Sequence, residues 1–156
     1  MSEYYNDREV YDTLCSMLNS INWRYDRFDD QMMITTGAVG EDMPMTFNIK
    51  VLPDKKCVIL YSRLPITVPE DMLVNVAIGI TAVNGTLVDG CFEINLSTGE
   101  IFFRATQVYR GIRVSPEMLR YMLLVSCETI DSFNDKFLEL IKGEKNLNEF
   151  IEEVRK

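Results

Sequence analysis

The feature that most constrains the fold is an uncharged stretch of 17 residues, Met72–Val88. It contains two asparagines and two glycines and is shorter than the roughly 20 apolar residues that a membrane-spanning helix requires. Pro69-Glu-Asp precedes it, which suits the first turn of a helix, and Asn84-Gly85 suits a helix end. We therefore predict an internal helix from Pro69 to about Gly85.

This predicted helix is apolar on both sides, whereas an ordinary surface helix has one charged face. A sheet can cover one side, and either a long C-terminal helix or a second subunit must cover the other. We expect a homodimer, because the small residues Gly79 and Ala82 permit close approach of a symmetric mate. The predicted dimer interface is Met72, Asn75, Ile78, Gly79 and Ala82.

The hydrophobic pattern predicts an α+β fold of order α-β-β-β-α-β-β-α(-α). Apolar residues at spacings of three to four indicate a first helix from Asp7 to about Ser20. Ser115-Pro-Glu begins a long helix to about Lys142, and a short terminal helix lies between Leu147 and Val154. Five strands are expected in one mostly antiparallel sheet: Met32–Thr36, Met45–Val51, Cys57–Ser62, Asp89–Leu96 and Glu100–Val108. Residues 37–44 are expected to form a loop.

Size and composition are typical of one globular domain. The 156 residues are 47% hydrophobic and 26% charged, so we expect a single domain over 1–156. Its core is expected over 8–142, with 143–156 as a short helical extension. The net charge of −8 argues against a nucleic-acid partner or an anionic membrane surface, since both favour basic proteins.

The four cysteines lie far apart, at Cys15, Cys57, Cys91 and Cys127. Each falls in an apolar run, and none forms a Cys-x-x-Cys pair. Reduced thiols are therefore expected, which indicates a cytoplasmic location. The polar, acidic first residues do not have the pattern of a signal peptide.

The chain contains no histidine, which excludes Ser-His-Asp and Cys-His catalysis as well as zinc sites that need histidine. Gly37-Ala-Val-Gly40 has no following lysine, so it is not a phosphate-binding loop. We predict no enzyme activity, no cofactor and no metal site.

Three stretches resemble a known family. They are Asn84-Gly-Thr-Leu-Val-Asp-Gly-Cys-Phe-Glu-Ile-Asn95, Gly99-Glu-Ile-Phe-Phe-Arg104 and Ser115-Pro-Glu-Met-Leu119, and Leu18–Tyr25 is also similar. They resemble the YbjN-like family of bacterial sensory transduction regulators, which has the type III secretion chaperone-like fold. In element order the resemblance covers residues 8–142.

The resemblance implies a non-enzymatic, dimeric protein-binding module, either a chaperone-like adaptor or a regulator. Chaperones of this fold hold an extended client segment across the sheet and the first helix. In this sequence those positions are Leu14, Leu18, Met33, Phe47 and Ile49.

The residues leave one alternative open, a sensory domain that binds a small molecule. Its pocket would lie between the sheet and the second helix, where Tyr61, Arg63 and Arg104 would orient an anion. A client-binding protein predicts an exposed apolar surface, whereas a sensor predicts a closed cavity with convergent polar groups.

Overall fold

The computed structural model describes residues 6–156. Its elements are α1 (Asp7–Ser20), β1 (Tyr25–Phe28), β2 (Met33–Val39), β3 (Pro44–Leu52), β4 (Cys57–Thr67), α2 (Leu73–Asn84), β5 (Cys91–Ile94), β6 (Glu100–Val108), α3 (Pro116–Lys142) and α4 (Leu147–Val154). Two short 3-10 helices, Asp29–Gln31 and Glu70–Met72, lie between β1 and β2 and before α2.

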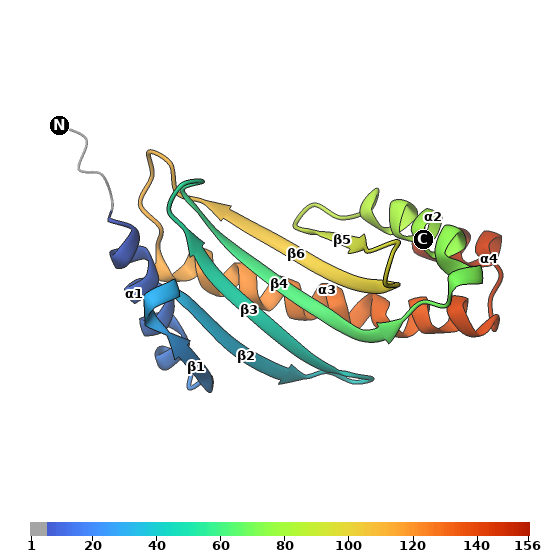
Figure 1. The fold of residues 1–156 in the computed structure, drawn as a ribbon, viewed down its shortest axis with the longest axis horizontal. Coiled ribbons are helices and arrows are strands. Elements are labelled where there is room, and N and C mark those ends of the chain that lie inside the picture. Colours follow the sequence, from blue (N-terminus) through green and yellow to red (C-terminus); the bar gives the residue numbers. More distant parts are fainter. Residues whose placement is uncertain (1–5) are drawn as a thin grey trace.

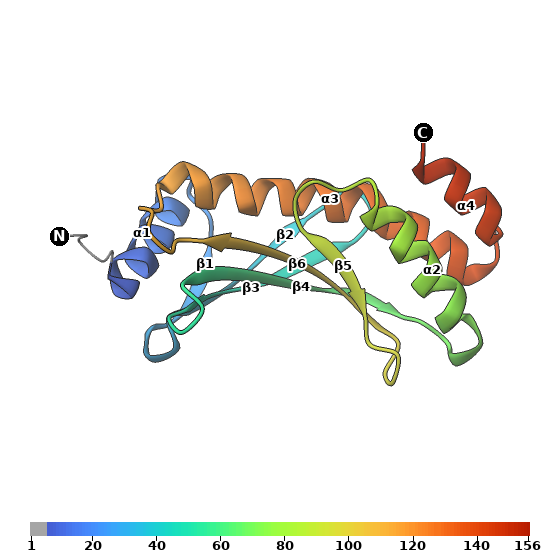
Figure 2. The same ribbon diagram turned by 90° about the horizontal axis from the view of Figure 1, so that it is seen from above.

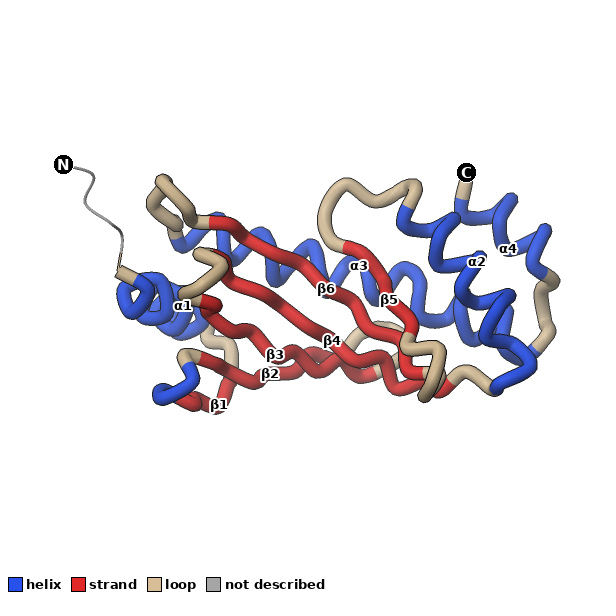
Figure 3. The backbone as a smooth tube through the Cα atoms, turned by 45° about the horizontal axis from the view of Figure 1, so that its top comes forward, coloured by secondary structure: helices blue, strands red, loops and turns tan. Residues whose placement is uncertain are grey.

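One antiparallel sheet holds all the described strands, in the order β1-β2-β3-β4-β6-β5 (Figure 1). Two helices, α1 and α3, lie against the same face of this sheet (Figure 2). At the β5 end of the sheet α2 packs against β5, and α4 packs against α2 (Figure 3). The helices therefore cover one face of the sheet and one of its ends.

The helix ends follow local sequence signals. Ser115 accepts a hydrogen bond from the Met118 amide at the start of α3, and Pro116 occupies its first position. Gly143 ends α3 with a φ of 75°, a left-handed conformation that favours glycine. At α4, Asn146 and Glu149 form a reciprocal capping box. The predicted bounds of α1 and α3 are confirmed.

The predicted count of five strands is wrong, because the sheet has six described strands. The additional strand is β1, in a segment that we predicted only as an extended entry to the first strand. β2 continues into the predicted loop as far as Val39, and β4 runs to Thr67. β5 is shorter than the predicted Asp89–Leu96, since it covers only Cys91–Ile94. The predicted β5–β6 hairpin and the β2-β3-β4 meander are confirmed.

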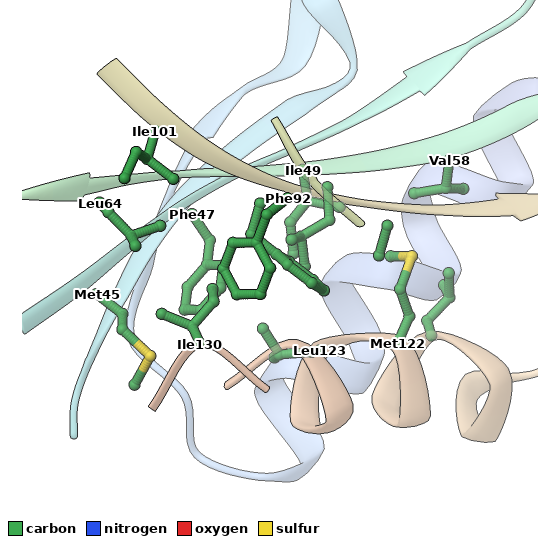
Figure 4. Packing of buried hydrophobic residues seen from close by; sticks show 14 of the residues in the cluster. Met45, Phe47, Ile49, Val58, Leu64, Phe92, Ile101, Met122, Leu123 and Ile130 are labelled. Carbon is green, nitrogen blue, oxygen red and sulfur yellow. The ribbon is translucent and has the colours of Figure 1, made fainter. Parts of the chain in front are cut away.

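The core lies between the sheet and α3. Met45, Phe47 and Ile49 alternate along β3 and point toward Leu123 and Ile130 of α3 (Figure 4). At the β5 end the core is aromatic. Its edge-to-face and stacked ring pairs have centroids 5.0–6.0 Å apart and join Phe92, Phe103, Phe133, Phe137 and Phe150. Phe150 is fully buried, so α4 contributes to the same core.

The β5–β6 pairing is short. It spans Cys91↔Arg104 to Ile94↔Ile101, whereas β4 pairs with β6 as far as Val108. On the β5 side, Ala105–Val108 therefore lies beyond the end of the pairing strand. Within residues 6–156, no helix is long and apolar enough to cross a membrane.

Candidate functional site

The sheet face that points away from α1 and α3 is not covered by any described helix (Figure 2). The strand register assigns its residues, because side chains alternate between the two faces of a strand. We call this surface the open face. Its residues include Asp26 and Phe28 of β1, Met33 and Thr35 of β2, Thr46, Asn48 and Lys50 of β3, Ile59, Tyr61 and Arg63 of β4, Cys91 and Glu93 of β5, and Glu100, Phe102, Arg104 and Thr106 of β6.

Apolar side chains are numerous on this face. Phe28 is exposed, and Met33, Ile59 and Phe102 are half-buried. A half-buried apolar side chain can lose its remaining exposed area when another molecule covers it, which favours association. The open face is thus an accessible surface of mixed apolar and polar character.

Two ion pairs cross the β5 and β4 sides of the open face. Arg104 contacts Glu93 at 2.7 Å, and Arg63 contacts Glu100 at 2.7 Å. Arg104 also donates to the Cys91 sulfur at 3.8 Å, and this bond together with the Glu93 charge raises the pKa of Arg104. These pairs are partly exposed, so water screens them and they orient side chains more than they stabilise the fold.

Beside the open face, two loops form one end of the molecule, which we call the tip. It consists of the β3–β4 turn, residues 53–56, and the β6–α3 loop, residues 109–115 (Figure 1). The Tyr109 amide donates to the Lys56 carbonyl at 2.8 Å, which joins the two loops.

The tip is anchored to α1 and bears exposed apolar groups. Lys56 Nζ and the Tyr109 hydroxyl both bond to the Asp7 carboxylate, at 2.9 and 2.5 Å. Ile112 of the tip is 49% exposed, and Val108, the last residue of β6 beside it, is 51% exposed. The sequence analysis did not predict this surface. Its signal in the sequence is the set of basic residues in the two loops, Lys55, Lys56, Arg110 and Arg113.

The predicted client-binding residues are mostly buried. Leu14, Leu18, Phe47 and Ile49 are at most 1% exposed, because α1 and β3 turn these side chains into the core under α3. Their assignment to a contact surface is therefore corrected. Met33 is on the opposite side of the sheet and belongs to the open face.

One residue of the predicted dimer interface on α2, Gly79, is buried within the same chain. A Cβ at Gly79 would lie 3.0 Å from Phe150 and 3.2 Å from Leu140, so the close approach that glycine permits is to α4. The assignment of Gly79 to the interface is therefore corrected. Met72 and Ala82 are half-buried and pack against the core, and their place in an interface stays a prediction. Asn75 and Ile78 remain exposed.

The packing does not favour the small-molecule alternative. The space between β5, α2 and α3 is filled by Phe92, Phe103 and Phe137, and the Asn84 side chain bonds to the Phe92 backbone. Tyr61, Arg63 and Arg104 do come together, since Tyr61 pairs with Arg104 across β4 and β6. They lie on the open face and not beneath α2.

Metal ligands do not gather anywhere in the described part of the chain: residues 6–156 hold no group of three or more cysteine and acidic side chains suited to an ion. All four cysteines are free thiols. Burial raises the pKa of Cys127 to about 11, so this thiol stays protonated near neutral pH.

Comparison with known proteins finds similarity only at the level of structure. No family model matches the chain, and no curated protein matches it. YbjN from E. coli aligns over 85% of this chain and 92% of its own, with a TM-score of 0.60 and 13% identity.

Two solved complexes are also similar. A chain of the HopA1-SchA chaperone-effector complex aligns over 84% of this chain and 98% of its own, with a TM-score of 0.56 and 11% identity. A chain of the ExsC-ExsE complex aligns over 81% and 93%, with a TM-score of 0.55 and 14% identity. The expected fold is confirmed: this chain has a YbjN-like fold, which is also the fold of type III secretion chaperones.

Proposed function

We propose that this protein is a chaperone-like binding module that holds a segment of another protein against its open face. The observation that carries the proposal is this face, an uncovered sheet surface with apolar side chains between polar ones. The fold supports it, since one similar structure is a chaperone-effector complex. No catalytic role is proposed, and the four free thiols favour the cytoplasm as its location.

Site-specific photocrosslinking in the native host tests this proposal. A photoreactive benzoyl-phenylalanine replaces Tyr61, at the centre of the open face, or Tyr121, which is exposed on α3 on the covered side of the sheet. We expect a discrete crosslinked polypeptide from position 61 and none from position 121. Crosslinking from position 121 alone, or equally from both positions, would contradict the proposal.

The proposal includes a homodimer that uses the side of α2 left free by α4. Val74 is 70% exposed and Ile78 is 44% exposed, one helical turn apart, and Asn75 lies beside them. Burial of this strip against a second copy would remove exposed apolar area from water.

Sedimentation equilibrium tests the dimer. The wild type is expected at twice the 18.0 kDa mass of the chain, and Ile78→Asp at that mass. Ile112→Asp, at a similarly exposed residue on the tip, should remain dimeric. A monomeric wild type, or an Ile78→Asp variant that is folded and unchanged in mass, would show that the interface is wrong.

A further inference from the structure

The charges of this acidic protein are unevenly distributed along the chain. Residues 43–69 and 101–116, which hold β3, β4, the tip loops and all of β6 except Glu100, contain a single acid, Asp54. The same residues contain seven of the 16 basic side chains: Lys50, Lys55, Lys56, Arg63, Arg104, Arg110 and Arg113. The rest of the chain carries nine bases and 23 acids. The strands of the open face also carry three acids, Asp26, Glu93 and Glu100, so the open face and the tip together hold seven bases and four acids. This surface therefore has a net positive charge on a protein of net charge −8.

Some of these cations are neutralised by neighbours and others are not. Arg63 pairs with Glu100, Arg104 with Glu93, and Lys56 with Asp7. Lys50, Lys55 and Arg110 make no ion pair within residues 6–156. These three cations are available to an incoming anion.

Two of these cations, Lys50 and Arg110, adjoin accessible apolar side chains. Lys50 is opposite Met33 on β2 and Ile59 on β4. At the tip, Arg110 lies between Val108 and Ile112 in the chain, and both are about half-exposed. The surface thus combines positive charge with apolar area.

We infer that the segment held by the open face and the tip is acidic and carries aliphatic side chains between its carboxylates. This inference rests on the proposed function and specifies the chemistry of the partner. Complementary charge steers the encounter and fixes the position of the segment, and apolar contacts add affinity. Three free cations are few for a nucleic acid, whose binding commonly neutralises many phosphates, and the surrounding acids repel a phosphate backbone.

Fluorescence anisotropy with two designed peptides tests the inference. The first is a labelled 12-residue peptide in which glutamates alternate with valines and serines, and its twin has lysine in place of each glutamate. We expect the full-length protein to bind the glutamate peptide and not the lysine twin. Binding is expected to weaken as salt is added, because exposed charges are screened.

Matched variants localise the effect. The triple variant Lys50→Gln, Lys55→Gln, Arg110→Gln should bind the glutamate peptide about tenfold more weakly, from the loss of three exposed attractions. The control Arg120→Gln, Lys142→Gln, Arg155→Gln removes the same total charge at exposed positions outside the surface and should bind like the wild type.

Several results would overturn the inference. They are equal binding of the two peptides, equal weakening in both triple variants, no binding of either peptide, and tighter binding of a 12-nucleotide thymidine oligomer than of the glutamate peptide. In each case the crosslink from position 61 distinguishes failure of the acidic-segment inference from failure of the proposed function. If that crosslink persists, the proposed function stands without an acidic partner, and if it is absent, the proposed function fails as well.

Discussion

At the scale of single residues, Asn134 on α3 is a buried side chain with an unsatisfied polar atom. It is 1% exposed, and its Oδ1 accepts a hydrogen bond from the next amide in the chain, that of Asp135, at 2.7 Å. Its Nδ2 has no partner within the described structure. A buried donor without an acceptor loses its bonds to water and gains none, which destabilises the folded state.

Asn134→Leu should therefore stabilise the protein. The two side chains have the same number of heavy atoms and branch at the same carbon, so the leucine can occupy the site without the cost of the unsatisfied amide. We expect the free energy of unfolding in urea to rise by about 1–2 kcal/mol. Asn148→Leu, at an exposed position of α4, should change it by less than about 0.5 kcal/mol. A less stable Asn134→Leu variant would mean that the amide has a bonding role.

Asp7 gives the protein a pH-dependent contribution to stability. Burial tends to raise the pKa of this carboxyl, but hydrogen bonds from Tyr109 and Lys56 outweigh it, so its pKa lies below the usual 3.8. Because the folded pKa is lower than the unfolded one, the stabilisation is complete above the unfolded value. It is lost as the pH falls through the folded value.

Asp7→Asn is expected to lower the free energy of unfolding by about 1–2 kcal/mol near pH 7, since hydrogen bonds to a charged group are lost. The difference from the wild type should shrink as the pH falls from about 4 toward 2. Urea midpoints across this range measure it, with the exposed Asp12→Asn on the same helix as the control. A difference that does not change with pH would contradict this account.

At the scale of elements, the packing of α4 on α2 depends on Gly79. Glycine inside a helix normally costs about 1 kcal/mol relative to alanine, so its position here needs a packing reason. That reason is the 3.0 Å separation between a Cβ at this position and Phe150. Larger side chains would push α4 away from α2.

Gly79→Val should lower the free energy of unfolding by about 1–3 kcal/mol through overpacking. The cost should be smaller in a Phe150→Ala background, where the facing ring is absent. A double-mutant cycle in urea measures this coupling. Equal costs in the two backgrounds would show that Phe150 is not the side chain that Gly79 accommodates.

How far the sequence predicts each element depends on whether its signal is local. The α3 helix was predicted to its ends because Ser115, Pro116 and Gly143 determine those ends through their own chemistry. In contrast, β1 is an edge strand whose side chains are exposed or half-buried, so it has no apolar alternation to reveal it. It forms because β2 pairs with it, which is information that the segment Tyr25–Phe28 does not contain.

The absence of tertiary information from local sequence also explains the errors at the candidate site. Alternation along β3 correctly predicted one buried and one accessible face, but Phe47 and Ile49 were assigned to the accessible one. Apolar residues at alternate strand positions indicate core, so the binding surface had to be sought at Asn48 and Lys50 between them. Which helix covers α2 depends on tertiary contacts such as Gly79 with Phe150 and is not encoded locally.

At the scale of the whole molecule, the core runs continuously from α1 to α4. Figure 1 shows α1 and α4 at opposite ends of the molecule. Trp23, which follows α1, packs against this core, and Phe150 and Val154 bury α4 in it. A continuous core predicts cooperative unfolding, in which a destabilising change at one end also lowers the unfolding midpoint measured at the other end.

Truncation after Gly143 removes α4 and tests this cooperativity. We expect the urea midpoint reported by Trp23, the only tryptophan, to fall together with the midpoint reported by far-UV circular dichroism. The loss of a fully buried phenylalanine corresponds to about 3–5 kcal/mol. An unchanged Trp23 midpoint would instead indicate two units that unfold independently.

The short β5 strand has a consequence for the behaviour of the protein in concentrated solution. Because β5 ends opposite Arg104, the Ala105–Val108 segment of β6 lacks a neighbouring strand on that side within the described chain. Unpaired strand edges are the sites at which β-rich proteins aggregate into ribbons. Two features of the chain oppose such growth. Arg110, two residues after this edge, places a positive charge beside it. The Gln107 side-chain amide donates to the Val108 carbonyl at 3.0 Å, so this acceptor is already occupied at the edge that a longer β5 would have covered.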